Sequence, residues 1–171
     1  MTQQNRTAIP STRWQADGAA PHGVMLLIAA LALAGVAAAL VSQYAFDMQP
    51  CPWCILQRLI FVVLGIVALG AAFVRAPLRR GLAGAVLLLS ALGAAAAVYQ
   101  NVVASKSASC NLTLADRILN ALGVETMAPW LFQVKASCAD AAVSLLGVPY
   151  ELWSLALFAL TGLLALRSVI R

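Results

Sequence analysis

The chain has 171 residues, of which 63% are hydrophobic and only 10% are charged, and its mean hydropathy is +0.90. Soluble domains have about 25% charged residues, so this composition excludes an ordinary soluble domain and predicts an all-α integral membrane protein. The formal net charge of +5 does not indicate nucleic-acid binding, because the basic residues are scattered between apolar segments rather than clustered in a stripe.

Apolar segments long enough to cross a bilayer as helices lie at residues 24–46, 55–74, 81–103 and 149–166. A crossing takes about 20 mainly apolar residues. The second segment is long enough if its helix begins near Ile55, and the fourth is the weakest because Glu151 lies at its start. We predict a four-helix transmembrane bundle, residues 24–171, preceded by a polar tail of residues 1–23, and we expect no cleavable signal peptide.

The distribution of basic residues predicts the orientation of this bundle. Arginines are concentrated on the side that holds both termini, namely Arg6, Arg13, Arg75, Arg79, Arg80, Arg167 and Arg171. Short loops rich in arginine and lysine stay in the cytoplasm, so we expect both termini and the turn at residues 75–80 to be cytoplasmic. The extracytoplasmic loops are then residues 47–54 and 104–148, and they hold all four cysteines in the compartment where disulfides persist.

The long second loop contains one amphipathic segment. Between Leu112 and Leu122, the apolar residues Leu114, Ile118, Leu119 and Leu122 recur at helical spacing. This pattern predicts a short helix on the membrane surface, although a loop collapsed onto the bundle is the simpler alternative. Trp130 would add a second contact at the level of the lipid headgroups.

Cys51 and Cys54 are spaced so that their sulfurs can meet at the start of a helix. A helix N-terminus stabilises a thiolate, which is the reactive form in thiol–disulfide exchange. Arg58 lies one helical turn after Cys54 on the same face, where its guanidinium can stabilise the thiolate or bind a carbonyl oxygen of a ligand. The alternatives are an inert disulfide and an arginine that anchors the helix at the membrane surface. Gln57 is a possible polar partner.

Metal and haem sites are not indicated by the four cysteines. A c-type haem site requires a histidine directly after the second cysteine, where this chain has Ile55. The remaining cysteines, Cys110 and Cys138, lack the spacing of a zinc site, and the chain's single histidine, His22, lies on the cytoplasmic side.

Cys110 and Cys138 lie in one loop and most simply form a disulfide. Taken alone, this disulfide would be a structural staple. The neighbouring pair Cys51–Cys54 instead favours a relay, in which the loop disulfide exchanges electrons with the second pair.

The segment from Cys51 to Arg58, CPWCILQR, resembles the Cys-x-x-Cys-Ile-x-x-Arg signature of the DsbB family, membrane proteins that generate disulfides with quinone. The resemblance covers about residues 24–168 and includes the four spans, the loop cysteines, and Pro149 with Trp153 at the start of the last span. The combination of the motif with the loop cysteines is highly specific, whereas four spans alone would not be.

The resemblance implies a multi-pass monomer in the bacterial inner membrane. The loop disulfide Cys110–Cys138 would oxidise a periplasmic DsbA-like thioredoxin-fold partner, with Cys110 as the sulfur that is attacked. Electrons would pass to the redox disulfide Cys51–Cys54 and then to ubiquinone or menaquinone. Cys54 would contact the quinone ring, and Arg58 would lie near a quinone oxygen.

Some relatives have a histidine near the extracytoplasmic end of the third span, where this chain reads Tyr99-Gln100-Asn101. A proton-handling role of that histidine cannot be transferred. A hydrogen bond from Gln100 or Asn101 to a quinone is one alternative, and the simpler expectation is that both face water or loop atoms. The alternative functions are a non-catalytic, disulfide-stapled scaffold and an enzyme like vitamin K epoxide reductase. The second places its quinone-proximal dithiol near the C-terminal end of the bundle, whereas Cys51 and Cys54 precede the second span.

Overall fold

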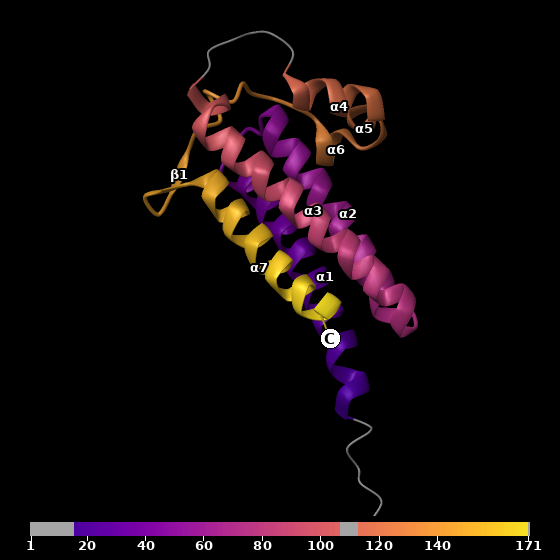
Figure 1. Ribbon diagram of the computed structural model, residues 1–171. Helices are drawn as coiled ribbons and strands as arrows, with labels where there is room; N and C mark the ends of the chain where they lie inside the picture. The colour runs from indigo at the N-terminus through magenta and orange to yellow at the C-terminus, as the bar shows by residue number, and fades with distance from the viewer. Residues whose placement is uncertain (1–15, 107–112, 171) are drawn as a thin grey trace, which may run out of the picture.

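The computed structural model describes residues 16–106 and 113–170 and is all-helical except for one small hairpin. Its long helices are α1 (Ala16–Ala45), α2 (Pro52–Phe73), α3 (Ala76–Val102) and α7 (Tyr150–Ile170). Each contains a segment long and apolar enough to cross a membrane, so the chain is a multi-pass membrane protein. The predicted four-helix bundle is confirmed, and Figure 1 shows the four helices packed side by side.

The helices extend beyond the apolar segments that predicted them. Helix α2 begins at Pro52, because Cys51 caps the helix by accepting a hydrogen bond from the backbone N–H of Cys54 at 3.3 Å. Proline suits the first helical position, where its missing N–H has no partner in any case. Helix α3 likewise begins before the predicted residue 81, at Ala76. Hydropathy identifies the part of a helix within lipid, whereas backbone hydrogen bonding continues past it.

Close packing of α2, α3 and α7 fixes the middle of the bundle. The rings of Phe61 and Phe158 stack with their centroids 3.9 Å apart. Gly93 makes room for this pair, since a Cβ atom there would lie 2.2 Å from the Phe158 ring. Ser90 and Thr161 share a hydrogen bond of 3.2 Å between α3 and α7. Small residues and buried hydroxyls of this kind are the usual contacts between helices in lipid.

The predicted amphipathic helix is α4 (Leu114–Leu122). Thr113 and Asp116 form a reciprocal capping box at its start, and it ends at Gly123, whose φ of 63° suits glycine. Leu119 is fully buried against the bundle, whereas Leu114 is 63% exposed. The helix is thus confirmed, and its contact with the membrane surface stays a prediction.

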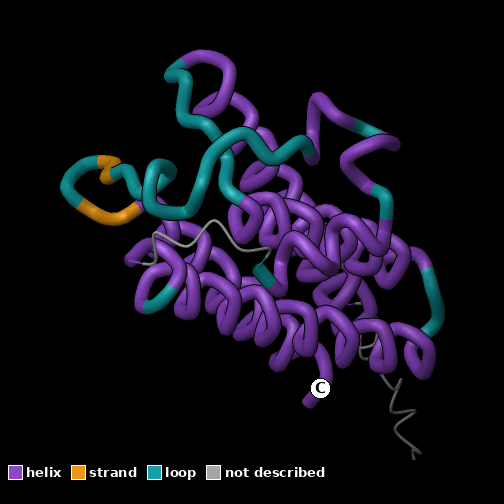
Figure 2. Tube along the Cα trace, turned by 90° about the horizontal axis from the view of Figure 1, so that it is seen from above, coloured by secondary structure: helices purple, strands orange, loops and turns teal. Residues whose placement is uncertain are grey.

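The loop between α3 and α7 contains other short elements on both sides of α4. They are η2 (Ala104–Lys106), α5 (Val124–Met127), α6 (Pro129–Phe132), β1 (Ser144–Leu145) and β2 (Val148–Pro149). All of them lie at the end of the bundle where α2 begins and α3 ends (Figure 1). The α2–α3 turn and the end of α7 lie at the opposite end. Figure 2 shows the hairpin projecting sideways from the helices.

Candidate functional site

The Cys51–Cys54 pair lies at the N-terminus of α2, as predicted. The two sulfurs are 2.8 Å apart, and both residues are free thiols in this structure. Cys51 is fully buried, whereas Cys54 is partly exposed. The two cysteines therefore have different surroundings, although they are only three residues apart. A disulfide between them stays a prediction.

Cys138 lies against Cys51, although the two residues are far apart in the sequence. A hydrogen bond from Cys51 lowers the pKa of the Cys138 thiol. The same bond, the contact with Cys54 and burial all raise the pKa of the Cys51 thiol. Hydrogen bonding to a charged form favours that form, so Cys138 is the sulfur poised to be a thiolate. Its predicted partner, Cys110, lies outside the described residues, and the disulfide between them stays a prediction.

Hydrogen bonds to Pro50 and from Tyr44 of α1 hold the loop that brings Cys138 to this position. The backbone N–H groups of Lys135 and Ala136 both donate to the Pro50 carbonyl, at 3.0 and 3.2 Å. Helix α6, just before them, is tethered in the same way. Its Trp130 carbonyl accepts a hydrogen bond of 2.7 Å from the Tyr44 hydroxyl of α1. The loop therefore meets the dithiol through backbone contacts that the sequence does not reveal.

Loss of the Cys51 donor should be visible in the reactivity of Cys138. Because the pKa of Cys138 is lowered, a larger fraction of this thiol is ionised at pH values below the ordinary thiol range. Its alkylation by iodoacetamide should therefore persist as the pH falls. In the reduced protein, Cys51→Ala should raise the pH midpoint of Cys138 alkylation by about one unit. Mass spectrometry of the labelled peptide measures this midpoint. Cys54→Ala keeps the donor and is the control; an unchanged midpoint in Cys51→Ala would refute the contact.

Arg58 is buried and joins three helices. Its Nη1 donates to Gln43 Oε1 at 2.9 Å and to the Leu131 carbonyl at 2.6 Å. Its Nη2 lies 3.5 Å from the Ala39 carbonyl. Its Nε is buried and has no hydrogen-bond partner in the described part of the chain. Arg58 thus has a structural role that we did not predict, and its role toward a ligand stays a prediction.

Two buried amides orient the sulfur of Cys54. Gln57 Nε2 donates to Gln100 Oε1 at 2.6 Å, and Gln100 Nε2 donates to Cys54 Sγ at 3.2 Å. Because the Gln100 oxygen is occupied by Gln57, its NH₂ group faces the sulfur and favours the thiolate. Gln100 is only 5% exposed, so the expectation that it faces water is wrong. Gln57 bonds Gln100 and reaches Cys54 only through it, so its role as a polar partner of the site stays a prediction.

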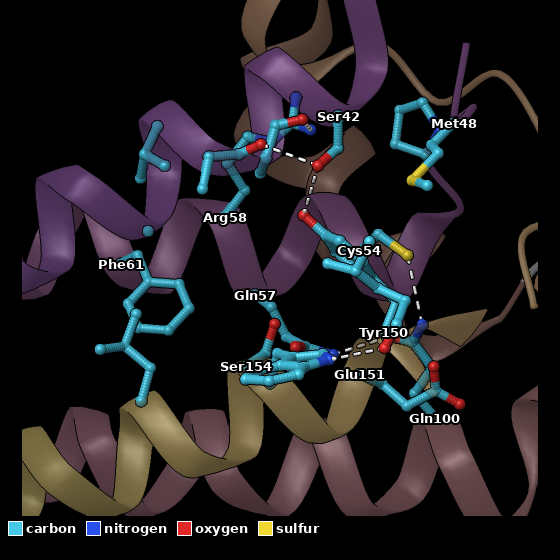
Figure 3. Close-up of a pocket in the computed structure, with 18 of the residues that line it drawn as sticks. Ser42, Met48, Cys54, Gln57, Arg58, Phe61, Gln100, Tyr150, Glu151 and Ser154 are labelled. Carbon is cyan, nitrogen blue, oxygen red and sulfur yellow. Dashed lines mark hydrogen bonds between the residues drawn. The ribbon is translucent and has the colours of Figure 1, made fainter. Parts of the chain in front are cut away.

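Cys54, Gln57, Arg58 and Gln100 line one cavity of about 490 Å³. Its polar end also contains Glu151, and Figure 3 shows these side chains around it. The apolar end lies between α1 and α7 and is formed by residues that include Gly35, Ala38, Leu157 and Leu160. Ligand cavities in proteins typically measure about 300–1,000 Å³ and combine apolar walls with a few polar groups. This cavity therefore suits a molecule with a polar head and an apolar tail.

Sequence reasoning does not identify Glu151 as a site residue, and it ranks a ligand contact of Gln100 below contact with water or loop atoms. Both are buried polar side chains at the ends of apolar helices, and each is 5% exposed. A polar residue inside an apolar span is costly and marks a functional site by default. That signal was present in the sequence. It was outweighed by the position of both residues near the loops, where contact with water is the usual outcome.

Comparisons with known proteins agree with this site. Residues 21–167 match the family model described as disulfide bond formation protein DsbB. The chain is 35% identical over 152 residues to disulfide bond formation protein B 1 of Pseudomonas syringae pv. syringae, covering 86% of this chain and 88% of that protein. It is 34% identical over 150 residues to disulfide bond formation protein B of Ralstonia nicotianae, covering 85% and 92%. Together with the dithiol at the start of α2, these matches show that the chain belongs to the DsbB family of disulfide bond formation proteins.

Proposed function

We propose that this protein is a protein-disulfide:quinone oxidoreductase that reoxidises a DsbA-like periplasmic thiol oxidase. Family membership implies a thiol–disulfide oxidoreductase. One observation supports the finer assignment above the others. Within a single dithiol, Cys51 contacts the loop cysteine Cys138, while Cys54 lines the cavity. Cys51 can therefore exchange with protein thiols, while Cys54 can react with a small-molecule acceptor in the cavity.

The contacts favour a fixed order of thiol–disulfide exchange. A thiolate of the partner attacks Cys110, the Cys110–Cys138 disulfide breaks, and Cys138 leaves as a thiolate. Cys138 then attacks Cys51, with which it is already in contact, and the Cys51–Cys54 disulfide breaks. Cys54 is released as a thiolate into the cavity, where the Gln100 amide stabilises it. The second thiolate of the partner then attacks the mixed disulfide and releases Cys110, which attacks Cys138 and releases Cys51. The partner gains a disulfide, the Cys110–Cys138 disulfide forms again, and two electrons reach the Cys51–Cys54 pair.

The cavity residues fit a quinone. The unpartnered Nε of Arg58 is a buried donor beside the cavity, and an acceptor oxygen would satisfy it. Cys54 would lie against the ring, and the apolar end between α1 and α7 would hold an isoprenoid tail. A bound quinone supplies a two-electron acceptor, which regenerates the Cys51–Cys54 disulfide. Ubiquinone and menaquinone share these features, and both are candidates.

We place the protein in the bacterial inner membrane as a monomer, with both termini in the cytoplasm and the four cysteines on the periplasmic side. The arginines at the α2–α3 turn support this orientation. The described cysteines lie together at the other end of the bundle. Residues 1–23 would form the cytoplasmic tail, and residues 24–171 would form the membrane domain. In this orientation the dithiol faces the compartment in which the partner works.

Arg58→Ala should weaken quinone use. Losing a charge-assisted hydrogen bond costs about 1.5–3 kcal/mol, which corresponds to a rise of roughly 10–100-fold in the apparent KM for quinone. Arg58→Lys keeps the charge but not the fork of donors, and an intermediate effect is expected. Steady-state quinone reduction measures both. Arg117→Ala, in the exposed face of α4, is the control. An unchanged KM for Arg58→Ala would remove Arg58 from the quinone site.

Purified protein in detergent tests the proposed function. With a reduced DsbA-like partner as electron donor, ubiquinone or menaquinone should be reduced as the partner's thiols disappear, one quinone for each disulfide formed. Absence of turnover with both quinones, from protein that is folded and has both disulfides, would instead favour a stapled scaffold.

A further inference from the structure

Glu151 is a buried carboxyl group that the exchange of thiols does not use. It lies in the first turn of α7 and is only 5% exposed. Its Oε1 accepts a hydrogen bond of 3.0 Å from Asn101 Nδ2 at the end of α3. Burial of a carboxyl group is costly, and one amide donor offsets only part of that cost. A role in the chemistry would explain why this group lies in the wall of the cavity.

Few of the described side chains in the cavity wall have a proton to give. The ionisable side chains that line the cavity are Cys54, Arg58, Tyr150 and Glu151. An arginine does not release its proton in proteins, and a phenol ordinarily ionises only near about pH 10. The Tyr150 hydroxyl also donates to Ser42 Oγ at 3.3 Å. The amides of the wall carry no exchangeable charge. Apart from the reacting Cys54, Glu151 is therefore the side chain of the wall suited to carry a proton.

The proposed reaction needs such a group. A quinone that accepts two electrons also takes up two protons as it becomes a hydroquinone. After thiol exchange the pair consists of a Cys51 thiol and a Cys54 thiolate, which together supply both electrons but only one proton. The second proton must come from another donor. Gln100 lies beside Cys54, but an amide cannot supply it.

We propose that Glu151 carries this second proton between periplasmic water and the cavity, an inference that rests on the proposed quinone reductase function. The Cys51–Cys54 disulfide forms as its two electrons leave. The Cys51 thiol gives one proton and the Glu151 carboxyl gives the other, so that two O–H bonds form on the acceptor. Glu151 is left as a carboxylate and regains a proton from water. Charge, protons and electrons balance across these steps.

Asn101 is the positioning residue for this carboxyl group. It is half-buried in the last turn of α3, at the loop end of the bundle. Its amide holds Oε1 at a fixed place. The other carboxylate oxygen carries the exchanging proton.

Glu151→Gln tests the proposal, because it keeps the shape of the side chain and removes the titratable group. The first readout needs no quinone. In the infrared spectrum of the dithiol state, the wild type should show the C=O band of a protonated carboxyl group that is absent in Glu151→Gln. The second readout is rapid-mixing kinetics, in which quinone reduction by the dithiol form should slow by about 100-fold. Glu151→Asp should restore part of the rate.

Glu125→Gln, the same chemical change in α5, should keep both the carboxyl band and the wild-type rate. Oxidation of the partner in a single turnover without quinone reports that Glu151→Gln is folded. An unchanged rate, or a carboxyl band that persists in Glu151→Gln, would overturn the proposal. If the wild type itself reduces no quinone, the proposed function fails, and the infrared band still decides whether Glu151 holds a proton in the dithiol state.

Discussion

Cys54→Ser is expected to abolish quinone reduction driven by the reduced partner, with a loss of at least about 1,000-fold. Cys54 is the sulfur of the pair that lines the cavity, and a serine hydroxyl neither forms a disulfide nor supplies electrons. Residues that react as a unit are lost together: removing one of them typically costs nearly as much activity as removing all of them. Spectrophotometric quinone reduction in detergent, with partner thiols counted in parallel, measures the loss.

Comparison of Cys54→Ser with Cys110→Ser separates the two halves of the reaction. Cys110→Ser should block oxidation of the partner, because Cys110 is the proposed site of attack. It should still reduce quinone when dithiothreitol replaces the partner. Wild-type activity in both variants would contradict the assignment of the four cysteines.

Cys138→Ser should stop electron transfer from the partner to quinone while leaving the cavity intact. The loop would then lack the sulfur that contacts Cys51, so partner-driven turnover should fall by at least about 1,000-fold. Dithiothreitol can reduce Cys51–Cys54 directly, and quinone reduction with this donor should remain within about two-fold of wild type. The ratio of the two activities is the measurement.

Ser137→Ala changes the neighbouring residue and removes only two exposed hydrogen bonds between the Ser137 hydroxyl and Asp140. It should leave both activities at the wild-type level. A Cys138→Ser variant that retained partner-driven turnover would show that electrons reach the dithiol without Cys138. The proposed order of exchange would then be wrong.

The local features of this fold could be predicted from the sequence. Length and hydropathy identify the four long helices, because a bilayer requires about 20 apolar residues for each crossing. The spacing of Leu114, Ile118 and Leu122 identified α4, and Cys51 and Cys54 marked the start of α2. These signals lie within a few residues of one another, and local periodicity reports them directly.

Contacts between distant segments could not be predicted in the same way. Arg58 was assigned to a ligand, yet most of its donors bind the backbone of α1 and α6 and the side chain of Gln43. The contact of Cys138 with Cys51 depends on loop N–H groups that bind the Pro50 carbonyl. Backbone groups are the same in every residue, so no side-chain pattern reveals which carbonyl a loop will reach.

Glu151 shows how a correct observation can be given the wrong weight. Because of this charged residue, the fourth apolar segment is the weakest of the four candidate membrane spans in the sequence. In the structure α7 begins at Tyr150 regardless, with the carboxyl group turned into the cavity wall rather than left in lipid. An ionisable residue at the margin of a span is evidence of a site as much as evidence against a helix.

Disulfide mapping of the Cys54→Ser, Cys110→Ser double variant is the most direct test of electron transfer from Cys138 to Cys51. This variant keeps two cysteines, Cys51 and Cys138, and neither has its predicted disulfide partner. After mild oxidation, mass spectrometry of the digested protein should find one disulfide that joins the two, formed within a single chain. Two free thiols, or a disulfide between two chains, would contradict the contact on which the proposed order of exchange depends.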